Sequence, residues 1–422
     1  MRRSFRKWVL NCCLTVSLGF CPGLGFAHDD AKLLQQWNNA FLDAIRQDSS
    51  APGIASRKMA ILYGAMFDAV NSLDPRFESY LDLDPTPKGL QPAQVAVGVA
   101  MRVGELEYPG HKGIFRQLMS KQLNLRGGIH SDSLKYGKQV ADQFLAARSN
   151  DGSSHSITYI PQDEIGVWKR TPPKYRPPET PQWSNVQSFC IAESKKVWAP
   201  GPPDITSEDY AKAWKQVRDL GGKNSTVRTE DQTEIAHFWS CFTYTATPAG
   251  HWNQIACNLL VEMEVPLVES LRLLALMNLA LADAGIYAWK VKYDYHFWRP
   301  WFAIRLADED GNSLTRSDSK WISLLEAPPH LEYVSGHSTY TGAAGEIIHQ
   351  FFGTDEIAFT ATSDSLPGVT RSFKSITECE QEIGISRIYG GIHFIFSNLD
   401  GLDLGHRVGR DVHNSFLRPL VY

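Results

Sequence analysis

The sequence lacks the signatures of several common protein classes. Among its 422 residues there is no Cys-x-x-Cys and no His-x-x-x-His spacing, which argues against a structural zinc site. No stripe of basic residues occurs and the formal net charge is −4, so we expect no nucleic-acid partner. Strand signals are few, and no segment after residue 27 reads as a membrane span. What remains is a mainly helical chain that is long enough for a large core.

The first 27 residues have the composition of an export signal peptide. A basic start at residues 2–7 precedes an apolar run at residues 8–20 that is too short to span a membrane as a mature helix. The basic start reads Arg-Arg-Ser-Phe-Arg-Lys, which resembles the twin-arginine pattern, although Sec export stays open. Small residues up to Ala27 predict cleavage there, and we expect a periplasmic or secreted protein. Four cysteines would remain, and they allow three disulfide pairings or free thiols: Cys190, Cys241, Cys257 and Cys379.

Apolar spacing in the rest of the chain predicts an all-α bundle fold. Residues 28–422 are expected to form one domain. The segment 151–203 interrupts the pattern with nine of the 23 prolines, and its aromatic residues predict an ordered excursion or lid. The apolar helix 267–292 is the expected central buried helix. The other expected helices span 30–47, 56–73, 92–106, 131–147, 207–220, 229–243, 252–261, about 338–352 and 401–417.

Three short patches near the C-terminus hold residues that suit a tetrahedral oxyanion. They read Lys292-x6-Arg299-Pro300, Ser335-Gly336-His337 and Ser386-Arg387-x5-His393. Arginine supplies a planar fork of donors and lysine a point charge, while a hydroxyl and a backbone N–H complete such a cradle. Lys292 and Arg299 are seven residues apart, which predicts one shared helix face. The helix after Ser-Gly-His is expected to point its N-terminus at the anion.

Together the patches resemble the signature shared by vanadium-dependent haloperoxidases and the phosphatidic acid phosphatase type 2 superfamily. That signature runs Lys-x6-Arg-Pro, Pro-Ser-Gly-His and Ser-Arg-x5-His-x3-Asp. The resemblance, to the bacterial haloperoxidase branch, covers most of residues 30–420 and implies two packed four-helix bundles with the anion site in residues 289–400. Val334 stands where the pattern has proline. Ser397 stands where it has the aspartate that would orient His393, and a backbone carbonyl, the Ser397 hydroxyl or Asp400 could replace that aspartate.

The resemblance implies vanadate as the cofactor. His393 is then the axial ligand of vanadium, and His337 is the acid–base group beside the anion. Lys292 both neutralises the anion and polarises peroxide. Hydrogen peroxide and a halide would be the substrates, hypohalous acid the product, and a small organic molecule a candidate acceptor. The residues implied to hold vanadate are Lys292, Arg299, Ser335, Gly336, Arg387 and His393.

The same cradle can also hold a phosphate that is being hydrolysed. In this alternative the chain is an exported acid phosphatase, His393 forms a phosphohistidine and His337 protonates the leaving alcohol. Two residues favour the peroxidase. Trp289 matches an aromatic that lines the halide pocket of chloroperoxidases, and His330 matches a second histidine of bromoperoxidases. The two matches point to different halides, and we favour bromide or iodide.

Other histidines and carboxylates are given structural or secondary roles. His251, His296 and His406 are interpreted as structural. The acidic residues of the helix at 229–243 are candidates for orienting His337: Glu230, Asp231 and Glu234. The oligomeric state stays open, with a homodimer as one option.

Overall fold

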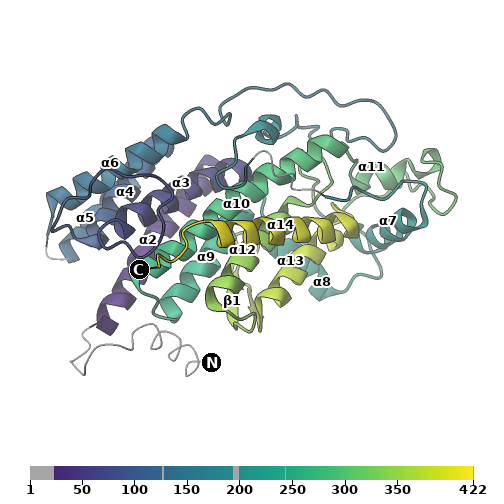
Figure 1. The fold of residues 1–422 in the computed structure, drawn as a ribbon. Coiled ribbons are helices and arrows are strands. Elements are labelled where there is room, and N and C mark those ends of the chain that lie inside the picture. Colours follow the sequence, from purple (N-terminus) through teal and green to yellow (C-terminus); the bar gives the residue numbers. More distant parts are fainter. Residues whose placement is uncertain (1–22, 126–127, 193–198, 243, 422) are drawn as a thin grey trace.

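The computed structural model describes residues 23–125, 128–192, 199–242 and 244–421. Residues 1–22 of the proposed leader lie outside this range, and residues 23–27 form the start of the first described helix. The export signal therefore stays a prediction. Helices dominate the described chain, as predicted, and Figure 1 shows them packed side by side in an elongated body.

The N-terminal helices form one end of the molecule (Figure 1). They are α2 (Gly23–Asp48), α3 (Pro52–Asn71), α4 (Pro92–Glu107), α5 (Lys112–Leu125) and α6 (Ser131–Ala147). Helices α3, α4 and α6 pack against one another, and α3 also packs against the central helix α10. All residues of α3 from Met59 to Asn71 are buried, because neighbouring helices cover every side of it.

The second group of helices is built on α10 (Leu267–Tyr295), which contacts α3 on one side and α12 and α14 on the other. By length and composition α10 could cross a membrane, but 94% of its most apolar window is buried inside the protein. It is the central buried helix that the sequence predicts. The remaining members are α7 (Glu208–Gly221), α8 (Glu230–Phe238), α9 (Thr247–Glu262), α12 (Gly336–Phe352), α13 (Ile376–Tyr389) and α14 (Ile395–Ser415).

The described parts of the proline-rich segment, residues 151–192 and 199–203, are mostly irregular and run along one side of the body between α6 and α7 (Figure 1). They are tied to the helical core by buried aromatic side chains and backbone hydrogen bonds. Trp168 and Trp183 are fully buried. The Trp168 N–H donates to the carbonyl of His296 at 2.7 Å, and the Glu179 N–H donates to the carbonyl of Pro329 at 2.7 Å. These bonds fix the segment beside the loops that carry the sequence patches.

The structure departs from the predicted helices in several places. The pattern does not reveal α5, α11 (Pro300–Arg305) or α13, nor the antiparallel hairpin of β1 (Phe359–Thr362) and β2 (Thr370–Phe373). The predicted helix 229–243 is shorter, because α8 ends at Phe238. The departure that matters most is at the end of α10. His296 adopts a left-handed conformation with φ of 53° and caps the helix, so Lys292 and Arg299 do not share one helix.

The four cysteines beyond the proposed leader are free thiols. Cys257 and Cys379 are buried, and Cys190 and Cys241 are partly buried. Burial raises the pKa of the Cys241 and Cys257 thiols to about 12, so both are uncharged near neutral pH. Of the alternatives that the sequence left open, disulfide pairs or free thiols, the structure has free thiols.

Candidate anion-binding active site

The three sequence patches come together where the ends of four helices meet. Lys292 lies in the last turn of α10, Arg299 is the N-cap of α11, Ser335 is the N-cap of α12, and Arg387 lies in the last turn of α13. His393 follows in the short loop before α14. We call this group the anion cradle, and its members are Lys292, Arg299, Ser335, Gly336, His337, Arg387 and His393.

A glycine turn lets the chain return from Arg387 to His393. Gly391 has φ of +75°, which favours glycine, and a Cβ atom there would lie 2.2 Å from the carbonyl oxygen of Gly221. The α13–α14 loop therefore sits directly against the end of α7. The turn places His393 within hydrogen-bonding distance of the Arg299 guanidinium.

Lys292 and Arg299 fasten the loop that leads into α12. The Nζ of Lys292 donates to the carbonyl oxygens of Leu331 at 2.9 Å and Glu332 at 3.0 Å, and also to that of Val334. The guanidinium of Arg299 donates to the carbonyls of His330 and Ile392 at 2.8 and 2.7 Å. Burial, and then the neighbouring cation, lower the pKa of Lys292 well below its usual value. Burial lowers the pKa of Arg299 to about 9, which keeps it charged near neutral pH.

The ring of His393 is held in one tautomer by its two partners. Its Nδ1 lies 2.8 Å from the Oε1 of Glu332, and its Nε2 lies 3.0 Å from the NH1 of Arg299. A guanidinium can only donate, so Nε2 is the acceptor and Nδ1 carries the proton. Burial, followed by the nearby cations, lowers the pKa of His393 well below its usual value. The ring is therefore neutral, with the Nε2 lone pair turned towards the arginine.

Glu332 is itself fully buried and fully bonded. Its Oε1 also accepts from the Phe394 N–H at 3.0 Å, and its Oε2 accepts from the Ser397 hydroxyl at 2.6 Å. Burial raises the pKa of the Glu332 carboxyl to about 7, against the opposing effect of Arg299. The carboxyl group therefore belongs to the cradle although it comes from none of the three patches.

His337 and Arg387 meet at the backbone of Trp239. The carbonyl of Trp239 accepts from the NH1 of Arg387 at 2.7 Å, and the same backbone hydrogen-bonds the ring of His337. Burial, and then Arg387, lower the pKa of His337 well below its usual value. Within the described residues, the Nε2 of His337 and the Nε of Arg387 are buried without a hydrogen-bond partner. The hydrogen bond to the Trp239 backbone uses the one N–H of the neutral His337 ring, so its Nε2 is an acceptor, whereas the Nε of Arg387 is a donor. A buried polar atom without a partner costs free energy, so the two atoms suit an oxyanion that carries both a hydroxyl group and free oxygens.

The start of α12 adds backbone donors to this cluster. The helix begins at Gly336, earlier than the sequence predicts, and Ser335 caps it by accepting from the Ser338 N–H at 3.4 Å. The first-turn N–H groups of Gly336 and His337 have no acceptor inside the helix, and they lie at its positive end. The helix N-terminus that was predicted to face the anion therefore begins inside the Ser-Gly-His motif itself.

The charges of the cradle do not balance. Lys292, Arg299 and Arg387 are each at most 1% exposed, and Glu332 is the carboxylate that the described structure places among them. Burying a charge without a partner is costly. An anion that carries several oxygens would offset the surplus positive charge and accept from the unpartnered Nε of Arg387.

A cavity of about 110 Å³ opens onto the cradle. Gly336, His337 and His393 line it, and so do Trp289 and His330. The centroids of the Trp289 and His330 rings are 5.1 Å apart, and the Nδ1 of His330 lies 2.9 Å from the NH2 of Arg299. The proline-rich segment contributes further lining residues, Arg176 and Glu179. The two predicted halide-pocket residues thus lie side by side at the cavity.

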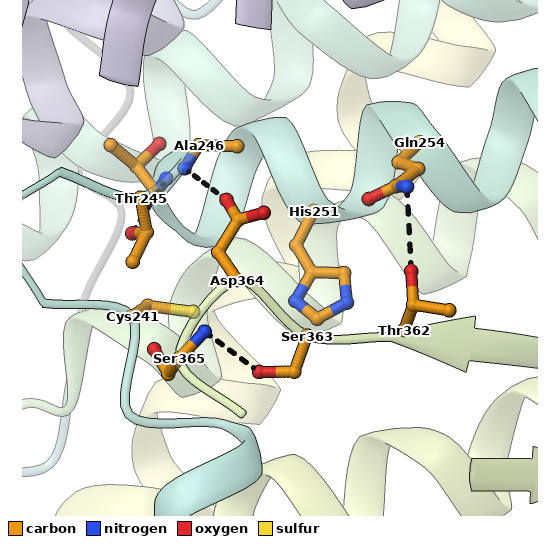
Figure 2. Close-up of a pocket in the computed structure, with 10 residues that line it drawn as sticks. Cys241, Thr245, Ala246, His251, Gln254, Thr362, Ser363, Asp364 and Ser365 are labelled. Atoms are coloured by element: carbon orange, nitrogen blue, oxygen red, sulfur yellow. Dashed lines mark hydrogen bonds between the residues drawn. The ribbon is translucent and has the colours of Figure 1, made fainter. Parts of the chain in front are cut away.

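A second, much smaller cavity lies next to the first and shares Cys241 and Thr247 with it. Figure 2 shows His251 and Asp364 beside this space, with Asp364 accepting from the Ala246 N–H at 2.8 Å. Its volume of about 10 Å³ has room for about one water molecule. Burial lowers the pKa of His251 to about 4, so this histidine is neutral. The cavity lacks the cations of the cradle and is no second anion site.

Comparison with known proteins agrees with this geometry. The family model described as the VCPO second helical-bundle domain matches residues 272–420. Vanadium chloroperoxidase from Curvularia inaequalis is 25% identical over 488 aligned residues, which cover 87% of this chain and 79% of that protein. The first bacterial vanadium-dependent iodoperoxidase structure aligns with a TM-score of 0.79 at 25% identity, over 92% of this chain and 97% of the other.

Residues 272–420 thus match a domain of a vanadium haloperoxidase, and most of the chain is similar to vanadium haloperoxidases. A holo-type bacterial vanadium-dependent chloroperoxidase shares the fold, with a TM-score of 0.68 at 17% identity over 86% of this chain and 92% of the other. The expected all-α haloperoxidase fold is confirmed by these matches.

Two residues of this site are not predicted from the sequence. Trp239 acts through its backbone, which leaves no signal in the sequence. Glu332 does leave one, because it is a lone charged residue inside the apolar run from Leu331 to Val334. Asp400, which was a candidate partner of His393, instead accepts from the Tyr333 hydroxyl at 2.7 Å.

The acidic residues of α8 also have a different role from the predicted one. Asp231 and Glu234 pair with Arg371 at 3.1 and 2.8 Å. His337 is oriented by the Trp239 backbone instead. The prediction that a carboxylate of this helix orients His337 is therefore wrong for these two residues, because Arg371 on β2 attracts them to the surface.

Proposed function

We propose that the protein binds vanadate in the anion cradle and oxidises a halide with hydrogen peroxide to hypohalous acid. The observation that carries the proposal is the surplus of buried positive charge around Lys292, Arg299 and Arg387. The unpartnered nitrogens of His337 and Arg387 support it, because a protonated oxyanion offers a hydroxyl donor to the first and an oxygen acceptor to the second. Within the described residues, no group of three or more His, Cys, Asp or Glu side chains could hold a cationic metal. The donor set instead suits an oxyanion that one histidine ligates.

The members of the cradle would divide the work of holding vanadate. His393 offers the Nε2 lone pair, which is the kind of ligand that a histidine gives to a metal. Arg299 and Arg387 neutralise the oxygens, while the Ser335 hydroxyl and the Gly336 N–H add hydrogen bonds. Lys292 and Arg299 would exchange some of their backbone acceptors for anion oxygens. Bound vanadate supplies a Lewis acid that activates hydrogen peroxide towards the halide without a change in its own oxidation state.

His337 is the residue that would move protons. Its ring is buried, its pKa is lowered, and its Nε2 is the unpartnered atom that faces this cluster. A neutral imidazole can accept a proton at Nε2 and return it, while the hydrogen bond to the Trp239 backbone keeps the ring orientation fixed. Formation of one hypohalous acid and one water from peroxide and halide consumes one proton, which this site can deliver.

Trp289 and His330 would form the halide site, with bromide or iodide preferred. The Trp289 ring offers a polarisable surface, and the positive edge of such a ring attracts an anion. Its indole nitrogen is occupied, because it donates to the carbonyl of Glu179 at 3.3 Å. Large, weakly hydrated halides lose the least on entering such a partly apolar cavity.

The experiment that tests this function measures halogenation and hydrolysis on one sample. Vanadate-loaded protein is analysed for vanadium and assayed with peroxide and chloride, bromide or iodide, and vanadate-free protein is assayed with nitrophenyl phosphate. We expect bound vanadium, halogenation with bromide and iodide, and feeble hydrolysis that vanadate suppresses. Robust hydrolysis without halogenation by any halide would instead support the acid phosphatase, in which vanadate only mimics a five-coordinate transition state.

We also propose that the chain is exported through its twin-arginine-like start. Arg2 and Arg3 followed by Phe5 and Lys7 motivate this proposal. Replacement of both arginines by lysine should leave uncleaved precursor in the cytoplasm. Unchanged export of the double variant would point to the Sec route.

A further inference from the structure

The family pattern places an aspartate four residues after the ligand histidine, and this chain has Ser397 there. In the structure the Ser397 hydroxyl does not contact His393 but donates to Glu332 at 2.6 Å. The carboxyl group that reaches the Nδ1 of His393, at 2.8 Å, comes from the loop before α12. In this chain the carboxylate beside His393 therefore belongs to Glu332 and not to the residue at the position of the family aspartate.

We propose that Glu332 is the positioning residue of the anion ligand in this chain, and that it replaces the missing aspartate by fixing the Nδ1–H tautomer of His393. The inference rests on the proposed anion-binding role of His393. Three hydrogen bonds to Glu332 hold its carboxyl group in place, from His393, Phe394 and Ser397. With Nδ1 protonated, the Nε2 lone pair is available to the anion.

The position of Glu332 ties the ligand to the rest of the cradle. The carbonyl oxygens of residues 331, 332 and 334 all accept from the Nζ of Lys292. The Glu332 N–H donates to the carbonyl of Phe297 at 3.0 Å, two residues before Arg299. One short loop therefore holds the lysine through its carbonyls and the histidine through its side chain. An aspartate on α14 could orient the histidine without this link to Lys292.

The chain contains a matched control for this pair. His406 and Glu380 form a second histidine–glutamate pair, with the Nε2 of His406 3.0 Å from the Oε2 of Glu380. This pair lies between α13 and α14, and neither residue lines the cradle cavity. The Glu380→Gln change therefore removes a comparable carboxylate without touching the anion site.

The test compares four variants with the wild-type protein: Glu332→Gln, Glu332→Ala, Glu332→Ala combined with Ser397→Asp, and Glu380→Gln. Dissociation constants for vanadate and for inorganic phosphate are measured by calorimetry, and melting temperatures are recorded for each variant. We expect Glu332→Gln to weaken binding of both anions about 10- to 100-fold, the usual cost of removing such an outer partner. Glu380→Gln should bind as the wild type does. The double variant should recover at least about tenfold over Glu332→Ala, because the aspartate returns the carboxylate to its family position.

Nitrogen NMR of the histidine rings gives a second readout that needs no bound anion. The His393 signals, assigned by their loss in His393→Gln, should show the Nδ1–H tautomer in the wild type and a mixture of tautomers in Glu332→Gln. Wild-type affinity together with an unchanged tautomer in Glu332→Gln would overturn the proposal. So would equal losses in Glu332→Gln and Glu380→Gln, since that result means general destabilisation. If the wild type binds phosphate and vanadate but halogenates nothing, the proposed function fails while the role of Glu332 stands.

Discussion

Two histidine–glutamate pairs of similar geometry have opposite electrostatic character. His393 and Glu332 are 2.8 Å apart in the anion cradle, and His406 and Glu380 are 3.0 Å apart between α13 and α14. Burial lowers the pKa of His393, and the cations around it lower the pKa further. Burial also acts to lower the pKa of His406, but the hydrogen bond and charge of Glu380 outweigh it and raise the pKa.

The two histidines differ in burial and in the surroundings of the ring nitrogen that does not bond the glutamate. In the cradle the remaining nitrogen of His393 faces Arg299, whose fixed positive charge disfavours an imidazolium. His406 is partly exposed, with 32% of its side chain accessible, and water can stabilise its charge. The same kind of carboxylate partner therefore accompanies a protonated imidazole at His406 and a neutral imidazole at His393. Burial and then the surrounding cations, and not the carboxylate, decide which of the two forms.

The largest expected effect comes from removing the ligand itself. His393→Ala eliminates the nitrogen that would bind the anion, while His406→Ala removes the matched histidine outside the cradle. We expect affinity for vanadate to fall more than about 100-fold in the first variant, because even outer partners of such ligands cost 10- to 100-fold. Calorimetric titration measures both variants. Equal affinity of His393→Ala and the wild type would show that the histidine is no ligand.

The second largest expected effect is on kcat, while vanadate binding should change little. His337→Ala removes the unpartnered Nε2 but leaves His393, Arg299 and Lys292 in place. We expect vanadate to bind within a few-fold of the wild-type affinity, whereas kcat falls about 10²- to 10⁴-fold, the usual contribution of a general acid–base group. Steady-state kinetics with saturating bromide and peroxide gives kcat. An unchanged kcat would assign proton transfer to another residue.

Helix prediction succeeded where one side of a helix is apolar. Helix α6 has the predicted bounds, and α4, α7 and α10 end within three residues of the predicted positions. Helix α13 was missed, because glutamates at 378, 380 and 382 lie among its apolar residues and interrupt the apolar stripe, although Glu380 is itself buried. Its helical state depends on packing against α8 and α12, which a local pattern does not contain.

The residues of the anion cradle could be predicted from the sequence, but the contacts between them could not. Lys292, Arg299 and Arg387 could be predicted because charged side chains at fixed spacings are visible in the sequence. The helix that was expected to join Lys292 to Arg299 is absent, since His296 ends α10 between them. The partner of His393 could not be predicted, because the path of the loop before α12 decides which carboxylate reaches the ring. The catalytic roles of all these residues remain predictions that the variants above test.

A smaller effect is expected at the wall of the cavity. His330→Phe keeps a ring beside Trp289 but removes the nitrogen that lies 2.9 Å from Arg299. If His330 belongs to the halide site, the KM for bromide should change about 2- to 10-fold, the equivalent of one hydrogen bond. Because Arg299 also loses a contact, vanadate affinity is measured on the same variant. A change in vanadate affinity with no change in the KM for bromide would limit His330 to supporting Arg299.

The smallest expected effect concerns the pair of His406 and Glu380 and is a change in how the free energy of unfolding depends on pH. Because the pKa of His406 is higher in the folded protein than its ordinary value of 6.5, the folded state binds the proton more tightly. The stabilisation by His406 is therefore complete below about pH 6.5 and is lost as the pH rises through the folded pKa.

We expect His406→Gln to remove this loss and to change the free energy of unfolding by about 1 kcal/mol or less, as for other partly exposed pairs. Urea denaturation between pH 5.5 and 8.5 measures it as the difference from the wild type. His393→Gln is the comparison, because a histidine whose folded pKa is lowered well below 6.5 stays neutral over the upper part of this range and adds no such loss there. If the difference between His406→Gln and the wild type stays constant with pH, the pair does not hold a proton in the folded state, and the contrast with the cradle disappears.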